Sequence, residues 1–137
     1  MPDTFSGFPS EAFDFFKQLA ANNKREWFLE HKDEYEQECR APMQALVAKL
    51  EPKFGPTKIS RINRDLRFSR DKKPYKTYIA AGVGGHYISL SATGVYVGAG
   101  LYKPEGELLQ RFREAVDDKA TGPRLARILK TLGDKGY

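Results

Sequence analysis

Cysteine and histidine are scarce in this sequence, and their scarcity excludes several kinds of site. One cysteine, Cys39, and two histidines stand among the 137 residues. A single cysteine excludes an intrachain disulfide, and a structural zinc site needs several Cys or His ligands in close spacing. We therefore predict no metal and no cofactor. A lone thiol is also typical of a reducing compartment, which favours the cytoplasm.

Long apolar runs are absent as well. No window approaches the apolar length that a membrane span needs, and the N-terminal stretch MPDTFSGFPSEAF lacks a basic region followed by an apolar run. The sequence therefore predicts neither export nor a membrane partner.

The recognised catalytic signatures are also missing. No G-x-S-x-G elbow marks a serine nucleophile, and no H-x-x-x-H or C-x-x-C spacing marks a metal site. A glycine-rich run at residues 82–86 lies between two predicted strands and opens no helix, so we interpret it as a turn and not as a phosphate-binding loop. The sequence names no reaction, and both an enzyme and a binding protein stay open.

What the sequence contains is typical of a folded domain. The residues are 40% hydrophobic and 12% aromatic, a composition of globular rather than disordered chains. A chain of this length buries roughly two thirds of its unfolded surface on folding. We predict a single domain over residues 1–137.

The N-terminal part shows helical periodicity. Ser10 is positioned to cap a first helix over residues 11–23, where Asn22 and Asn23 suit its end and Asn23 can also start the next helix. We predict a second helix over residues 24–40, which Pro42 then kinks or restarts. One stripe of the second helix carries Trp27, Phe28, His31, Tyr35 and Cys39.

From Lys58 the apolar period changes to that of strands. Ile62, Leu66 and Phe68 alternate with polar residues, which predicts a half-buried strand. Arg64 then falls on the apolar side, so it should pair with a carboxylate, face a cavity or mark a bulge. Three further segments, TYIAAGV, HYISLS and VYVGAGLY, are separated by short turns and predict an antiparallel meander.

Two amphipathic segments close the chain. Residues 107–116 and 123–132 each repeat apolar side chains at helical spacing. Helices, then strands, then helices predict the α+β fold class, with the N-terminal helices packed on the meander.

The positive charge of the protein is concentrated in one place. Residues 61–76, the basic segment, hold seven bases and two acids, whereas the rest of the chain holds sixteen of each. The net charge of +5 therefore belongs to this segment. Such a concentration attracts phosphate or carboxylate groups.

We predict that the basic segment binds a small, phosphate-bearing anion. Arginine forks onto such oxygens, whereas lysine adds a point charge. Asp65 and Tyr75 are the candidates for acid–base catalysis if a reaction occurs. The predicted ligand-binding residues are Arg61, Arg64, Arg67, Lys72, Lys73 and Lys76.

Two alternatives remain beside the small anion. Aromatic side chains interleaved with the cations could stack on unpaired bases, which would make the segment a nucleic-acid-binding module. The second alternative is structural, because residues 26–38 are strongly acidic and could pair with the basic segment. The oligomeric state is not predicted.

Three motifs resemble the DUF2461 family of uncharacterised conserved proteins. They are NNKREWFLEHKDEY at residues 22–35, RINRDLRFSRDKKPYKT at residues 61–77 and GVYVGAGLYKPE at residues 94–105. The resemblance runs from about Phe8 to Asp118 and implies an α+β domain without an established activity. Lys73 and Tyr102 depart from the residues usual in the family. Members also continue past this C-terminus, so the resemblance implies that the chain is shorter than its relatives.

Overall fold

The computed structural model describes residues 4–101 and 103–137, so Tyr102 lies outside the described residues. Helices precede and follow a four-stranded antiparallel sheet, which confirms the α+β class. The chain forms two compact units, one ending at Gly100 and the other beginning at Leu101. The single domain over residues 1–137 stays a prediction.

The first unit begins with a layer of helices. They are α1 (Ser10–Ala21), α2 (Arg25–Glu30), α3 (Lys32–Glu34), the π-helix η1 (Tyr35–Arg40) and α4 (Ala41–Phe54). The predicted helix over residues 24–40 is therefore interrupted after α2, at His31, and it widens into a π-helix. Pro42 lies in the first turn of α4, which follows η1 directly with helical dihedral angles at Arg40 and Ala41.

The predicted helix caps were partly wrong. Ser10 is the first residue of α1, and its hydroxyl donates to the Glu11 carboxylate at 3.1 Å instead of capping the helix. Asn22 does end α1, because its backbone N–H donates to carbonyl groups of the last turn. Lys24, not Asn23, precedes α2.

The sheet consists of β1 (Thr57–Ile59), β2 (Tyr78–Val83), β3 (His86–Ser91) and β4 (Gly94–Ala99), paired in sequence order. The predicted meander is confirmed. Val83 pairs with His86, which leaves Gly84 and Gly85 as a two-residue turn with φ values of +51° and +85°. Positive φ at both positions is what such a tight hairpin requires, so glycine is favoured at each.

The predicted strand through Ile62, Leu66 and Phe68 was wrong. Residues 60–77 form a long loop between β1 and β2, with one isolated bridge between Asn63 and Tyr75. Ile62 is buried, but the Phe68 side chain is 95% exposed. The alternation fails because short polar side chains within the loop bond to its own backbone and so compete with strand pairing.

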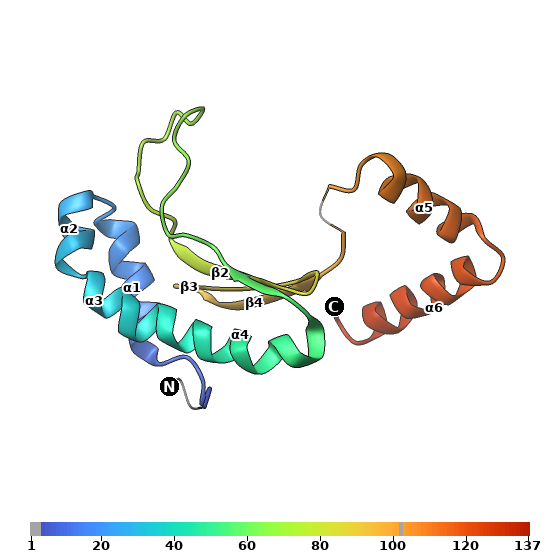
Figure 1. Cartoon of the computed structure of the whole chain (residues 1–137), viewed down its shortest axis with the longest axis horizontal. Coiled ribbons are helices and arrows are strands. Elements are labelled where there is room, and N and C mark those ends of the chain that lie inside the picture. Colours follow the sequence, from blue (N-terminus) through green and yellow to red (C-terminus); the bar gives the residue numbers. More distant parts are fainter. Residues whose placement is uncertain (1–3, 102) are drawn as a thin grey trace. The chain divides into compact units, whose positions relative to one another are not determined.

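Over β1, β2 and β3, one face of the sheet is covered by the helices (Figure 1). Phe15 lies at the centre of the core, with its ring 5.4–6.5 Å from the rings of four other aromatic residues. Ile79 of β2 and Leu90 of β3 point into the same cluster and are fully buried. This packing fixes β2, and therefore the end of the loop that leads into it.

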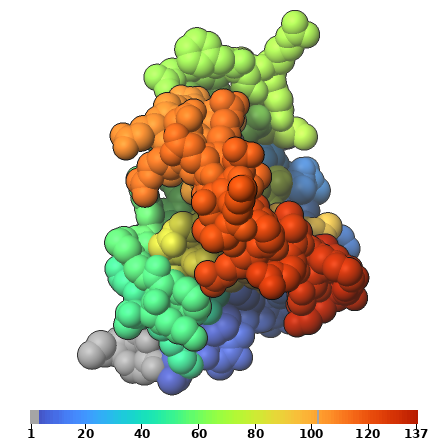
Figure 2. Space-filling view, turned by 90° about the vertical axis from the view of Figure 1, so that its right-hand side faces the viewer, coloured from blue at the N-terminus to red at the C-terminus, as the bar shows by residue number. Residues whose placement is uncertain are grey.

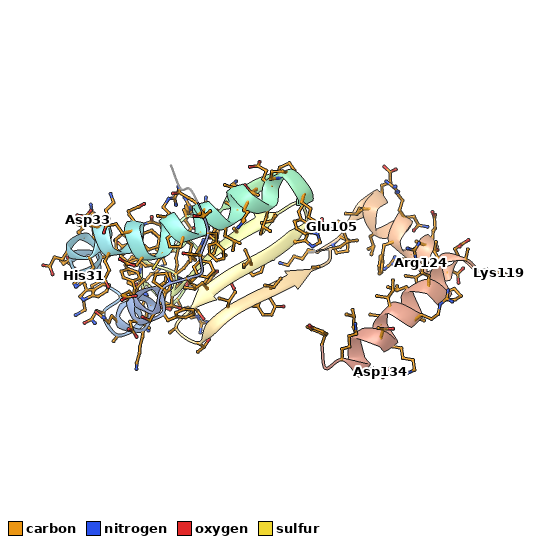
Figure 3. All side chains as sticks on the ribbon, turned by 90° about the horizontal axis from the view of Figure 1, so that it is seen from below. His31, Asp33, Glu105, Lys119, Arg124 and Asp134 are labelled. Carbon is orange, nitrogen blue, oxygen red and sulfur yellow. The ribbon has the colours of Figure 1, made fainter. Side chains whose placement is uncertain are left out.

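The second unit is a pair of helices, α5 (Gly106–Asp117) and α6 (Thr121–Asp134), which confirms both predicted C-terminal helices. Lys119 lies in the turn between them (Figure 3). The Asp118 carboxylate accepts from the N–H groups of Ala120 and Thr121 at 2.8 and 2.9 Å, and so stabilises the start of α6. Within the described residues, none of the helices is long and apolar enough to cross a membrane.

Candidate functional site

The basic segment projects from the sheet as an extended loop (Figure 1). Its residues stand out from the surface at the top of the space-filling view (Figure 2). Two ion pairs within the loop brace it, and both use its own aspartates. Among the residues that the structure describes, five of its seven cations have no carboxylate partner.

Arg64 is the central brace. Its Nη1 donates to the Asp71 carboxylate at 2.9 Å and to the Lys73 carbonyl at 3.0 Å, and its Nη2 donates to the Ser69 hydroxyl at 3.4 Å. The side chain is 27% exposed. The sequence-based expectation that Arg64 meets a carboxylate is confirmed, and the guanidinium holds together two stretches of the loop.

Asp65 and Arg67 form the second brace. The Arg67 guanidinium contacts the Asp65 carboxylate at 2.6 Å, and the Arg67 N–H donates to the same carboxylate at 3.2 Å. These hydrogen bonds lower the pKa of Asp65. Asp71 behaves alike, because the Lys73 N–H at 3.0 Å and then Arg64 lower its pKa. Both carboxylates are therefore ionised at neutral pH.

Two of the lysines also hold the loop. Lys72 Nζ donates to the Leu66 carbonyl at 3.0 Å, and Lys76 Nζ donates to the Arg61 carbonyl at 2.8 Å. Partial burial, and secondly the charge of Arg61, lower the pKa of Lys76. A cation that is partly desolvated and has no carboxylate gains from a bound anion.

The base of the loop is fixed by Asn23, which lies between α1 and α2. Its Nδ2 donates to the Tyr75 carbonyl at 2.9 Å, and the Tyr75 N–H donates to its Oδ1 at 3.0 Å. The Tyr75 ring is buried and stacks on Phe28 with centroids 4.2 Å apart. The helical layer thus positions the segment that leads into β2.

A pocket of about 430 Å³ opens beside this base. It brings together five of the predicted site residues, namely Arg64, Asp65, Lys73, Tyr75 and Lys76. Arg61, Arg67 and Lys72 are not among its lining residues. Four residues of the wall lie outside the set of predicted site residues: Asn23, Asp71, Thr77 and Tyr78. Asp71 belongs to the basic segment, and Thr77 and Tyr78 follow it directly. Asn23 is far from the segment in sequence, and its place in the NNKREW motif is the signal that could have pointed to it.

The comparisons with known proteins place the chain in a family. Residues 11–135 match a family model described as a conserved hypothetical protein (DUF2461). The chain belongs to the DUF2461 family. No curated protein and no solved structure matches it. The match confirms the resemblance seen in the three sequence motifs, and the description of the DUF2461 family names no activity.

The acidic helical region does not pair with the basic segment in this DUF2461 chain. Throughout residues 4–101 and 103–137, the ion pairs of residues 61–76 stay within the loop. The acidic region instead forms a local pair between Glu36 and Arg40 at 3.7 Å. Among the described residues, the predicted pairing of the basic segment with the acidic helices is therefore absent.

Reactive groups elsewhere in the first unit are buried. Burial raises the pKa of the Cys39 thiol to about 12, and Glu34 and Glu38 add to this effect. Burial also raises the pKa of Tyr35 to about 12. Neither group is a nucleophile near neutral pH. Among the described residues, no cluster of three or more His, Cys, Asp or Glu side chains could hold a metal ion.

We expect the two braces of the loop to open in acid. The pKa of Asp65 and that of Asp71 lie below the ordinary value of 3.8, so the contribution of the two ion pairs to the stability of the loop is fully present above about pH 4. It is lost as the pH falls through the lowered values. The amide protons of Arg67 and Lys73 donate to these carboxylates, so their NMR shifts should titrate with those low midpoints. Midpoints at or above 3.8 would contradict the braces.

Proposed function

We propose that the pocket at the base of the basic segment binds a small, phosphate-bearing anion. The observation that carries the proposal is the charge of the pocket wall. Asp65 and Asp71 line the pocket but are paired with Arg67 and Arg64. Lys73 and Lys76 line it too, and within the described residues neither has a carboxylate partner.

The dimensions of the pocket favour an organic phosphate over a bare ion. Pockets for small molecules and cofactors typically enclose about 300–1,000 Å³, and this pocket, which is open to solvent, has a volume of about 430 Å³. Tyr78 is 38% exposed at the pocket wall and offers an aromatic surface to the organic part of the ligand. In this arrangement Lys73 and Lys76 contact the anion, and Arg64 keeps the wall in place.

The predicted roles of the other site residues change accordingly. Arg61, Arg67 and Lys72 contribute a long-range field, because they do not line the pocket. Asp65 and Tyr75 are the candidates for acid–base chemistry. A carboxylate with a lowered pKa is a weak base at neutral pH, so we propose binding and not catalysis as the function of the site. The single buried cysteine suits a cytoplasmic location.

The test compares two exposed cations of the same loop. Lys73→Ala removes a pocket-lining charge, whereas Arg70→Ala removes a charge that does not line the pocket. Isothermal titration of the full chain with pyrophosphate and with a mononucleotide should show a loss of affinity of at least about tenfold for Lys73→Ala, since a hydrogen bond to a charged group contributes about 1.5–3 kcal/mol. Arg70→Ala should change affinity by less than about twofold, because exposed charges interact weakly.

Two results would count against the pocket. Equal losses in both variants would show that the anion is held by the general field of the loop. Absence of saturable binding in the unmodified protein would remove the proposal altogether. Thermal unfolding of each variant serves as the folding control, because neither side chain takes part in a brace of the loop.

A further inference from the structure

The outer face of the sheet, opposite the helices, has an unusual composition. Side chains alternate between the two faces of each strand, and Ile79 and Leu90 mark the face that packs on the helices. In the three long strands, the positions that alternate with this inner face form the outer face, and the register places them in adjacent rows. These positions are Tyr78, Ala80, Gly82, Tyr87, Ser89, Ser91, Gly94, Tyr96 and Gly98.

Two of the tyrosines form a pair on this face. Tyr87 is 40% exposed and Tyr96 is 64% exposed. Their ring centroids lie 6.1 Å apart in an edge-to-face arrangement. Gly98 leaves space for the Tyr96 ring, whose Cε1 lies 3.2 Å from where a Cβ at residue 98 would stand. The glycine thus lets an exposed aromatic ring lie along the strand.

A lysine of the neighbouring strand lies beside this uncharged face. None of the nine outer positions named above is charged. Lys58 of β1 pairs with Gly82 and so lies in the same row as Tyr87. Tyr78 begins β2 directly after the basic segment. Tyr87 pairs with Gly82, which lies four residues after Tyr78 in β2. Along the strand, Tyr87 is therefore about 13 Å from Tyr78 at ~3.3 Å per residue.

We propose that the outer face of the sheet binds single-stranded nucleic acid. Unpaired bases would stack on Tyr87 and Tyr96, and the phosphates of the same strand would reach Lys58 and the cations of the basic segment. Aromatic residues beside a cationic track are the general means of holding single strands, because every base has a π-face. A duplex hides those faces. Of the residues on the strands, this surface shares Tyr78 with the anion pocket, whereas its phosphate track includes Lys73 and Lys76 of the pocket wall. Base stacking on Tyr87 and Tyr96 needs no small anion in the pocket, so the inference does not rest on the proposed function.

Fluorescence anisotropy with a labelled oligothymidylate and the full chain tests this surface. Tyr87→Ala and Tyr96→Ala should each weaken binding by about tenfold, within the range found for base–aromatic stacking. Tyr96→Phe should bind like the unmodified protein, because the ring is kept. Tyr137→Ala is the matched control, since Tyr137 is 90% exposed but lies outside the sheet, and it should have no effect. Affinity should fall steeply with added salt.

Several outcomes would overturn the inference. They are unchanged affinity in both alanine variants, equal affinity for a duplex of the same length, and binding to phosphatidylserine vesicles without binding to the oligonucleotide. Titration of Tyr96→Ala with pyrophosphate tests the pocket separately. Normal pyrophosphate binding with lost oligonucleotide binding supports both sites, whereas oligonucleotide binding without any pyrophosphate binding supports the sheet face and removes the pocket.

Discussion

Replacing Gly84 by alanine is expected to lower the free energy of unfolding of the first unit by more than about 3 kcal/mol. A Cβ at residue 84 would overlap the carbonyl oxygen and carbon of Phe54, the last residue of α4. The Gly84 N–H also donates to the Pro56 carbonyl at 2.9 Å. The obstacle is backbone, so no side-chain rotation relieves it, and either the turn or the end of α4 has to move.

The neighbouring glycine provides the control. Gly85 has a φ of +85°, and a Cβ there would have no atom within 4 Å. Gly85→Ala should therefore lower the free energy of unfolding only by the cost of a left-handed backbone at alanine, about 1–2 kcal/mol. Urea unfolding followed by the fluorescence of Trp27, the single tryptophan, measures both variants in the first unit. Equal losses at the two positions would contradict the close approach of the turn to α4.

The regular elements of this protein could be predicted because their signal is local. Apolar residues at helical spacing located α1, α4, α5 and α6, and the segments separated by short turns located β2, β3 and β4. The glycine-rich run at residues 82–86 resembled a phosphate-binding loop, but its place between two strands identified it as a turn. Gly84 and Gly85 confirm that interpretation.

The basic segment could not be predicted in the same way. Its apolar residues alternate as in a strand, yet Arg64, Asp65 and Asp71 bond within the loop and replace strand pairing. The burial of Ile62 and the exposure of Phe68 follow from that network and not from the period. A pattern of residue types does not show which carboxylate meets which guanidinium.

Contacts between residues far apart in the sequence could not be predicted either. The Asn23 side chain meets Tyr75 across 52 positions of sequence, and no local pattern announces such a pair. The sequence indicated only that Asn23 lies at the end of the first helix and can start the next one. The pocket wall therefore combined five predicted residues with four that required the tertiary structure.

Asn23→Ala is expected to cost about 2–4 kcal/mol, because it leaves the N–H and the carbonyl of Tyr75 without partners in a partly buried position. Asn22→Ala is the matched control. Asn22 donates its Nδ2 to the Gln18 carbonyl at 2.9 Å on the exposed end of α1, so its loss should cost less than about 1 kcal/mol. Urea unfolding followed by Trp27 fluorescence compares the two, and equal costs would contradict a structural role of Asn23 at the base of the loop.

Asn23→Asp sharpens the same prediction. A carboxylate still accepts from the Tyr75 N–H, but it cannot donate to the Tyr75 carbonyl, and its charge faces that oxygen at the 2.9 Å where the amide stood. The folded protein should therefore raise the pKa of the new carboxyl group, since only the protonated form can donate. Because this pKa is raised, the loss of unfolding free energy in Asn23→Asp, compared with the unmodified protein, should be largest at neutral pH. It should shrink as the pH falls through the raised pKa. The deficit of Asn23→Ala should not follow the pH, because alanine does not titrate. Parallel pH profiles for the two variants would show that the Asn23 amide does not donate to the loop.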